Sequence, residues 1–243
     1  MDSIRFTDIH CHGLYGIDDG AKNEKETIEM IKLAYEEGIR TIIFTPHFYG
    51  GNKEYSTENT KKIFGIIVKR IKEIYPDMNL YLGNEILFSG GLLEELKKGN
   101  ALTLANTKYT LVEFNVFEEY NDIYSGLKSL IEGGYRPIIA HVERYEAISG
   151  RTDRIDELIK LGAYIQVNCK SLTGGLFNRK TKWLITLLND SMIHFIADDS
   201  HGIKNREPIM KSVYKKLEKK VDKNLLRKIA VDNIERLMDD DYI

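Results

Sequence analysis

The segment RFTDIHCH, residues 5–12, joins a short strand pattern to two histidines, and the prediction of the fold starts from it. Apolar and β-branched residues predominate at positions 5–9, which predicts a β-strand. His10 and His12 follow directly. Residues two apart in extended backbone point to the same side, so both imidazoles face one way and Cys11 faces the other. The prediction of the fold therefore depends on whether similar side chains also follow the other strands.

Beyond this segment, short β-branched runs alternate with segments of helical periodicity. Strands are predicted at residues 5–9, 40–45, 80–83, 109–114, 137–140, 163–167 and 193–197. Helices are predicted at residues 23–37, 56–75, 121–132, 152–161 and 180–189, and two more close the chain. Seven strands that alternate with helices predict parallel α/β units, in an open doubly wound sheet or in a closed barrel. No linker or low-complexity segment interrupts the pattern, so residues 1–243 are expected to form a single domain.

Chemically active side chains gather where the predicted strands end. They are His10, His12, His47, Glu85, Glu113, His141, Asp199 and His201, at or just after six of the seven strands. In an open sheet, strand ends about 4.8 Å apart would spread these groups along one edge. In a (β/α) barrel they meet at one mouth. The pattern therefore favours a TIM-like barrel.

The residue types at these positions are those that bind divalent metal ions in proteins. Imidazole nitrogens and carboxylate oxygens together suit transition ions. Each residue alone has an ordinary explanation: Glu113 could form a core ion pair, and Glu85 could stabilise a helix N-terminus. Their joint occurrence at six strand ends makes a shared metal site the better interpretation. His194 lies inside the last predicted strand, and we expect it to be packed there.

Composition and cysteine usage argue against several other functions. The formal charge is −2, from 35 basic and 37 acidic residues, so a broad nucleic-acid surface is not expected. The H-C-x5-R loop of thiolate phosphatases needs an arginine six residues after its cysteine, but Ile17 follows Cys11 and Gly175 follows Cys169 at that spacing. Two cysteines, no apolar run of about 18 residues and no signal-peptide pattern predict a cytoplasmic protein without a membrane span.

A lysine-dense stretch occupies residues 211–228. Its apolar residues recur every four positions, at Val213, Leu217, Val221, Leu225 and Ile229. This spacing is typical of one or two helices with one buried face. We interpret the lysines as the solvated opposite face.

Seven short motifs together carry a resemblance to a known family. They are Asp8-Ile9-His10-Cys11-His12-Gly13, Gly16-Ile17-Asp18-Asp19-Gly20, Thr45-Pro46-His47, Gly83-Asn84-Glu85-Ile86, Leu111-Val112-Glu113-Phe114, Ala140-His141-Val142-Glu143-Arg144-Tyr145 and Asp199-Ser200-His201. In these motifs the chain resembles the bacterial manganese-dependent protein-tyrosine phosphatases of the polymerase-and-histidinol-phosphatase (PHP) superfamily, CpsB/CapC type. The resemblance implies a distorted seven-stranded (β/α) barrel, the PHP fold, and a metal-dependent phosphomonoester hydrolase.

The resemblance also implies a centre of three manganese ions, with iron, zinc or magnesium as alternatives. The first ion would be bound by His10, His12, Glu85 and Asp199, the second by Glu85, Glu113 and His141, and the third by His47, His201 and Asp18. Arg144 and Arg206 match catalytic positions that hold or protonate the phosphate ester. No covalent phosphoenzyme is expected.

The substrate that the resemblance favours is phosphotyrosine on a bacterial tyrosine kinase that regulates capsule or exopolysaccharide synthesis. One alternative is a small-molecule phosphatase such as histidinol-phosphate phosphatase. Another is a non-catalytic regulator whose metals are structural. An aromatic substrate ring could be framed by the loop at residues 48–52 together with Phe117, Tyr120 and Tyr145.

Overall fold

The computed structural model describes residues 4–50, 56–175 and 178–243. Within these ranges helices and strands alternate as an α/β protein. The strands are β1 Phe6–Cys11, β2 Ile39–Phe44, β3 His47–Tyr49, β4 Asn79–Leu82, β5 Glu85–Leu87, β6 Tyr109–Glu113, β7 Arg136–Ile139, β8 Tyr164–Asn168 and β9 Phe195–Ala197. The helices are α1 Glu24–Glu36, α2 Thr57–Ile74, α3 Leu92–Lys98, α4 Tyr120–Glu132, α5 Thr152–Leu161, α6 Arg179–Asn189, α7 Met210–Leu217, α8 Lys223–Arg227 and α9 Asn233–Met238.

In the described residues the strands pair in parallel, as the alternation of strands and helices predicts. One sheet has the order β1-β2-β4, and the other has the order β3-β5-β6-β7-β8-β9. The two sheets meet where Cys11, the last residue of β1, forms an isolated bridge with Ser200, which follows β9. There the Asp199 N–H donates to the His10 carbonyl, and the His12 N–H donates to the Ser200 carbonyl, both at 2.9 Å. The α/β class is confirmed, and in the described residues the strands form two sheets joined by this bridge.

Two of the predicted strands are each interrupted close to the site. The strand predicted at 40–45 ends at Phe44, and β3 begins at His47 after Pro46, which has no N–H to continue a ladder. The strand predicted at 80–83 ends at Leu82, and β5 begins at Glu85. Because β3 pairs with β5 in parallel, His47 and Glu85 are register partners. These two residues therefore begin new short strands, whereas the sequence placed them at the ends of longer ones.

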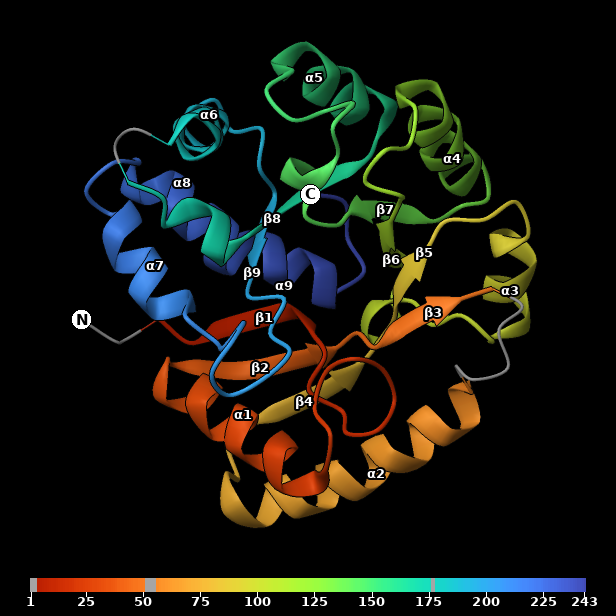
Figure 1. Cartoon of the computed structure of the whole chain (residues 1–243), viewed down its shortest axis with the longest axis vertical. Coiled ribbons are helices and arrows are strands. Elements are labelled where there is room, and N and C mark those ends of the chain that lie inside the picture. Colours follow the sequence, from red (N-terminus) through yellow and green to blue (C-terminus); the bar gives the residue numbers. More distant parts are fainter. Residues whose placement is uncertain (1–3, 51–55, 176–177) are drawn as a thin grey trace.

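Helices cover the outside of the sheets (Figure 1). α1 and α2 lie against the three-stranded sheet, while α4, α5 and α6 surround the six-stranded sheet. Side-chain caps fix several starts: Asn23, Ser56 and Asn178 each accept a hydrogen bond from an N–H of the first turn of α1, α2 and α6. Within the described residues, no helix is long and apolar enough to cross a membrane.

The predicted helices match the structure closely, with two differences. α3 was not expected, since seven residues between Gly91 and Gly99 give too short a periodic pattern to be recognised. The lysine-dense stretch forms α7 and α8, and α8 continues through a π-helical turn into α9. Val213, Leu217, Val221 and Ile229 are buried as predicted, whereas Leu226 is buried and Leu225 is half-buried against the core.

Candidate metal centre

The side chains singled out at the strand ends meet in one place. β1 carries His10 and is followed by His12, β3 and β5 begin with His47 and Glu85, and β6 ends with Glu113. His141 follows β7, and Asp199 and His201 follow β9. Ligand atoms from these eight residues fall into overlapping groups whose members lie within 4.8 Å of one another.

The most deeply buried group consists of His10, His12, Glu85 and Asp199. The two Nε2 atoms of the histidines lie 3.1 Å apart. Glu85 places Oε1 3.2 Å from Nε2 of His10 and Oε2 3.1 Å from Nε2 of His12. Asp199 Oδ1 lies 3.4 Å from Nε2 of His10. Atoms bound to one ion at about 2.0–2.2 Å lie roughly 3–3.5 Å from one another, so this spacing fits a shared ion.

A second group surrounds the other side of the Glu85 carboxylate. Oε1 of Glu85 lies 2.6 Å from Nε2 of His141, and Glu113 Oε2 lies 3.8 Å from that nitrogen. His47 Nδ1 lies 3.1 Å from Glu85 Oε2 and 3.3 Å from Glu113 Oε1. Among the described residues, that buried nitrogen has no partner with hydrogen-bond geometry. A buried nitrogen facing two carboxylates without a hydrogen bond fits a place for a cation.

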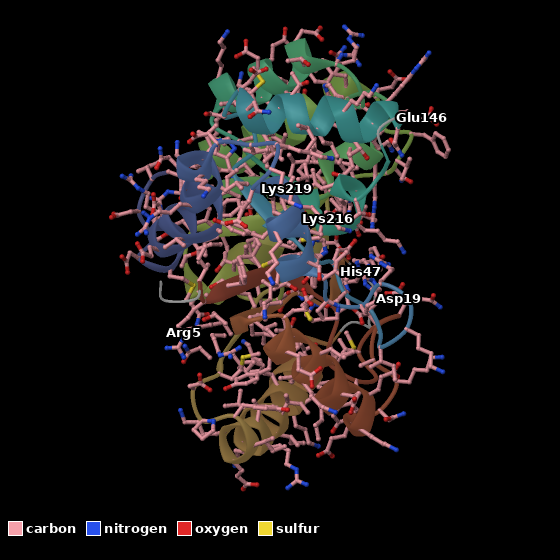
Figure 2. All side chains as sticks on the ribbon, turned by 90° about the vertical axis from the view of Figure 1, so that its left-hand side faces the viewer. Arg5, Asp19, His47, Glu146, Lys216 and Lys219 are labelled. Carbon is pink, nitrogen blue, oxygen red and sulfur yellow. The ribbon has the colours of Figure 1, made fainter. Side chains whose placement is uncertain are left out.

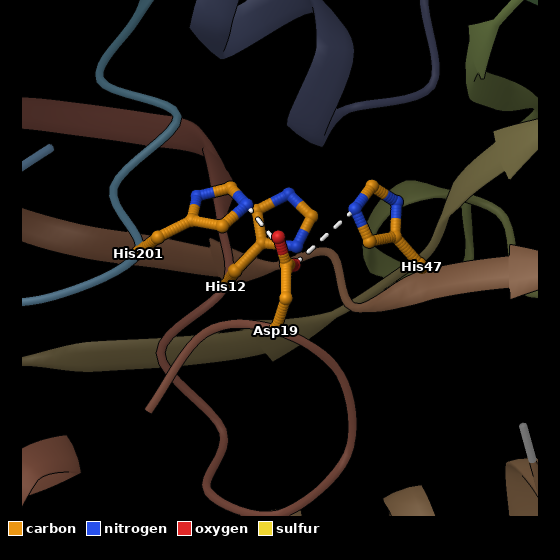
Figure 3. A group of neighbouring side chains, drawn as sticks. All are labelled: His12, Asp19, His47 and His201. Carbon is orange, nitrogen blue, oxygen red and sulfur yellow. Dashed lines mark ion pairs between the residues drawn. The ribbon is translucent and has the colours of Figure 1, made fainter. Parts of the chain in front are cut away.

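The third group lies at the edge of the site and is drawn in Figure 3. Asp19 Oδ1 lies 3.3 Å from Nε2 of His201 and 3.5 Å from Nε2 of His47. The His12 ring stacks on the His201 ring with centroids 3.9 Å apart. Asp19 was not among the ligands expected from sequence. Its side chain is 65% exposed, which leaves one side of this group open to solvent.

Asp18, the expected ligand from this loop, points to the interior. Its Oδ2 lies 2.7 Å from Nδ1 of His12 and accepts the His47 backbone N–H at 3.0 Å. The loop can close this tightly because Gly20 approaches the His12 carbonyl: a Cβ at Gly20 would lie 1.8 Å from that oxygen. The structure thus places Asp18 against the outer nitrogen of His12 and Asp19 toward His47 and His201.

Hydrogen bonds to the outer nitrogens orient the histidine rings. Gln166 Oε1 lies 3.3 Å from His10 Nδ1 and accepts the His141 backbone N–H at 2.8 Å. The Asp199 carbonyl oxygen lies 3.0 Å from His201 Nδ1. A proton held on each outer Nδ1 leaves the Nε2 lone pair directed into the site, which is how metal-binding histidines are usually oriented.

Sequence reasoning missed the polar residues of β8. Gln166 and Asn168 are both buried, two residues apart on the strand that seemed to contribute nothing. Asn168 Nδ2 donates to Asp199 Oδ2 at 2.7 Å. Asp8 was also missed: its Oδ1 accepts the backbone N–H groups of His10 and Asp198. Polar residues at alternate positions of a buried strand are the signal that could have revealed the pair on β8.

The electrostatics of the site favour positive charge. Burial lowers the pKa of His12, but the carboxylates of Asp18 and Glu85 outweigh it and raise that pKa to about 9. Burial likewise opposes charging of His47, yet Glu113 and Glu85 raise its pKa to about 11. A site that holds protons so firmly exchanges them for a metal ion when one binds.

Arg144 and Arg206 both reach the centre from the rim. Arg144 Nη2 lies 2.5 Å from Asp199 Oδ2, and Arg206 Nη2 lies 2.5 Å from Asp199 Oδ1. The arginine side chains are 39% and 33% exposed, so they connect solvent with the buried carboxylate. His141, Asp199 and Arg206 also have positive φ angles of 33°, 52° and 58°. Such conformations cost energy in non-glycine residues and cluster at functional sites.

The burial of the cysteines and of the expected aromatic residues decides what each of them can do. Cys11 and Cys169 are buried, and burial raises the pKa of both thiols well above the ordinary value, so neither is a ready nucleophile. Tyr145 is fully buried, and its hydroxyl oxygen accepts the Phe114 N–H, so it does not frame a substrate ring. Phe117 is 76% exposed. Residues 51 and 52 of the expected loop lie outside the described ranges.

Comparison with known proteins places the chain in a family. The family model for capsular polysaccharide synthesis, CpsB/CapC, matches residues 6–239. Tyrosine-protein phosphatase CpsB of Streptococcus pneumoniae is 32% identical over 241 residues, which cover 97% of this chain and 99% of the relative. Tyrosine-protein phosphatase YwqE of Bacillus subtilis (strain 168) is 36% identical over 201 residues, or 82% of this chain and 78% of the relative.

Solved structures agree with this placement. A structure from the pair YwqE of Bacillus subtilis and CpsB of Streptococcus pneumoniae, described as unique metal-dependent tyrosine phosphatases, superposes with a TM-score of 0.89 at 31% identity. It covers 98% of this chain and 96% of that chain. The phosphotriesterase homology protein of Escherichia coli shares the fold at a TM-score of 0.62 and 11% identity, covering 98% and 100% of the two chains. The chain belongs to the CpsB/CapC family of capsular polysaccharide synthesis proteins.

Proposed function

We propose that this protein is a manganese-dependent phosphatase that removes phosphate from phosphotyrosine in proteins. The observation that carries the proposal is the convergence of five histidines with Glu85, Glu113 and Asp199 on one site whose rim holds Arg144 and Arg206. The names of the relatives, tyrosine-protein phosphatases, support the substrate class. The description of the matched structures as metal-dependent supports a metal cofactor.

Three divalent ions fit the three groups of side chains. The first would be held by His10, His12, Glu85 and Asp199, and the second by Glu85, Glu113 and His141. For the third, with His47 and His201, the distances to Asp19 Oδ1 make Asp19 the better oxygen ligand, and Asp18 then serves to orient His12. Metal analysis of protein purified with manganese should approach three ions per chain, and a value below one would contradict this assignment.

Bound divalent ions supply a water of lowered pKa and shield the charge of the phosphoryl oxygens. The protein's own residues do the rest. The guanidinium groups of Arg144 and Arg206 lie beside Asp199, where they can each bind phosphoryl oxygens through two N–H groups. Gln166 and Asp18 fix the rings of His10 and His12. Because the thiols are buried and lack a nearby phosphate-binding arginine loop, the residues provide no covalent route through cysteine.

The physiological substrate in this proposal is a tyrosine-phosphorylated protein in the bacterial cytoplasm. A tyrosine kinase that regulates capsule or exopolysaccharide synthesis fits the family description, which names capsular polysaccharide synthesis. The substrate would meet the site from the open side near Asp19, the exposed member of the third group.

Turnover of two substrates by the same manganese-loaded preparation tests the proposal. We expect hydrolysis of a phosphotyrosine peptide with a kcat/KM at least about 10²-fold above that for histidinol phosphate. His12→Ala should lose at least about 10²-fold on the peptide, the scale expected when a catalytic metal is lost. A higher kcat/KM for histidinol phosphate would reassign the substrate. No turnover of either compound at full metal content would make the centre non-catalytic.

A further inference from the structure

A cavity of about 520 Å³ opens beside the proposed metal centre and is much larger than a phosphoryl group requires. Arg144, Asp199 and Arg206 form the wall that it shares with the centre. Lys170 and Lys216 also line it. The volume falls within the range of about 300–1,000 Å³ typical of ligand-binding cavities. Whatever occupies this cavity is therefore in contact with the groups that bind the phosphate.

The two aspartates of the cavity have partners, whereas two of its lysines have none among the described residues. Asp199 is already bound by two arginines, and Asp198 is buried and accepts the Ile209 N–H at 3.1 Å. Lys170 and Lys216 are exposed, and no ion pair or hydrogen bond of either ammonium group is found among the described residues. Glu207 is the remaining acid on the wall. Two lysines thus lack a counterion in a cavity next to a site for anions.

A second, smaller cavity of about 160 Å³ adjoins the first one. Both are lined by Thr173 and Lys216, and the smaller one adds Lys219 and Lys220 and no acidic residue. Figure 2 shows the order along this side of the molecule, from Lys219 to Lys216 and on to His47 and Asp19. We name the two cavities together, with Lys170, Lys216, Lys219 and Lys220, the basic groove.

The local structure explains why these lysines are held at the groove. Lys170 belongs to the short 3₁₀ helix Cys169–Leu172 directly after β8, and Cys169 and Leu172 anchor that turn in the core. Lys216 lies on α7, which buries Val213 and Leu217. The lysine-dense stretch thus does more than form a solvated face, because part of it borders the site. Since the whole chain carries a net charge of −2, this excess of cations is a local feature.

We propose that the basic groove binds acidic side chains, Asp or Glu, that flank the phosphotyrosine of the substrate, and so makes the enzyme selective for acidic phosphotyrosine segments. The inference rests on the proposed function, because it takes the phosphotyrosine as the group bound at Arg144 and Arg206. Continuity with that site favours a segment of the substrate itself as the occupant. The free ammonium groups favour carboxylates as its chemistry.

Matched peptides with one phosphotyrosine test the proposal on the manganese-loaded protein. Three Glu residues flank the phosphotyrosine in one peptide, and three Gln or three Lys residues replace them in two others, each placed on the N-terminal or the C-terminal side. We expect kcat/KM to favour a Glu peptide over its Gln partner by about tenfold, the scale of two or three partly exposed ion pairs. This ratio should shrink toward one between 50 and 500 mM NaCl, because salt screens such pairs.

Variants locate the source of the preference. In the double variant Lys170→Gln/Lys216→Gln the Glu-to-Gln ratio should fall below about twofold, and Lys170→Glu/Lys216→Glu should favour the Lys peptide. Lys69→Gln, the same change on exposed α2, should keep the wild-type ratio. A folding defect lowers the turnover of all peptides and leaves their ratios unchanged. The ratios therefore separate a folding defect from the loss of the two lysine charges.

Binding of the same peptides, with a non-hydrolysable phosphonate analogue of phosphotyrosine, keeps the inference testable without turnover. Fluorescence anisotropy should give the same order of affinities. Equal binding of Glu and Gln peptides, or a preference that persists in both double variants, would overturn the basic groove while leaving phosphatase activity intact. If the Glu peptides bind selectively but no peptide is hydrolysed, the proposed function is wrong and the role of the basic groove in binding is retained.

Discussion

Oδ2 of Asp18 lies 2.7 Å from Nδ1 of His12, and both side chains are essentially inaccessible to solvent. The same oxygen accepts the backbone N–H of His47, so one carboxylate connects two of the proposed ligand histidines. With a proton fixed on Nδ1, the His12 ring turns Nε2 to Glu85 at 3.1 Å. Asp18 therefore supports the centre through His12.

Replacing Asp18 with Ala should weaken manganese binding by about 10- to 100-fold, the range found when the partner of a metal-binding histidine is removed. Asp18→Asn keeps an acceptor for the His12 N–H without the charge, so its affinity should lie between those of wild type and Asp18→Ala. Calorimetric titration of the metal-free proteins with manganese gives the affinities.

Asp156→Ala is the control for that series, since Asp156 pairs with Lys160 on the surface of α5. It should bind manganese as tightly as the wild type. If Asp18→Ala also binds manganese with unchanged affinity, Asp18 does not orient a ligand and the assignment of its role is wrong.

Substitution of Arg144 or Arg206 should impair turnover and leave the metals bound. Each alanine variant should lose about 10²-fold in kcat/KM on a phosphotyrosine peptide, as expected when a donor to transition-state charge is removed. Lysine should restore only part of the loss, because an ammonium group cannot reproduce the planar fork of arginine. Arg151→Lys, which changes a surface pair with Asp153, is the matched control and should retain full activity. Activity near the wild-type level in both alanine variants would leave the arginines without a catalytic role.

Much of this site could be predicted because its candidate metal ligands follow a simple rule of position. Parallel strands bring their ends together, so histidines and acids after strands such as β1, β7 and β9 were expected to meet, and they do. The resemblance added the two arginines, and the structure places both on Asp199.

The remaining features depend on strand register and turn geometry, which the periodicity of apolar residues does not predict. The breaks after Phe44 and Leu82 precede the short paired strands β3 and β5, and only the three-dimensional register shows that His47 lies opposite Glu85. Within Asp18-Asp19-Gly20, the tight turn against the His12 carbonyl decides which carboxylate points inward. Gln166 was not singled out from the sequence, because a glutamine inside a strand is not a common metal ligand. Its side-chain oxygen contacts His10 Nδ1 and accepts the His141 backbone N–H, and both histidines are proposed ligands.

Neither cysteine should be required for activity. Cys11 is buried, its thiol receives a hydrogen bond from Ser200 Oγ at 3.3 Å, and burial raises its pKa well above the ordinary value. Cys11→Ser and Cys169→Ser should therefore retain more than about half of the wild-type kcat at equal metal content. Steady-state kinetics with metal analysis of the same samples checks this. A Cys11→Ser protein that keeps its fold and metals but loses activity would restore a thiolate mechanism.

His194 should make the protein less stable in mild acid. Burial, together with nearby Lys228, lowers the pKa of His194 to about 4 from an ordinary 6.5, and its Nδ1 accepts the Ile165 N–H at 3.1 Å. Below pH 6.5 the unfolded chain binds a proton that the folded protein does not, so this contribution to stability is complete above pH 6.5 and is lost as the pH falls toward 4. The loss should be about 2 kcal/mol between pH 7 and pH 4.5.

His194→Asn removes the titration and keeps an acceptor near the Nδ1 position. Urea unfolding at pH 7 and pH 4.5 should show a smaller decrease in the free energy of unfolding for this variant than for the wild type. Equal decreases in the two proteins would mean that His194 does not contribute to acid sensitivity.

Dependence of phosphotyrosine hydrolysis on metal content is the most direct test of the account. The protein is stripped with a chelator, manganese is returned in steps, and bound metal and kcat/KM on a phosphotyrosine peptide are measured on each sample. We expect less than about 1% of full activity without metal, and recovery that follows occupancy as it rises toward three ions per chain. Full activity in protein shown to be free of metal would contradict the account, because the histidines and carboxylates that converge on Glu85 would then serve no catalytic purpose.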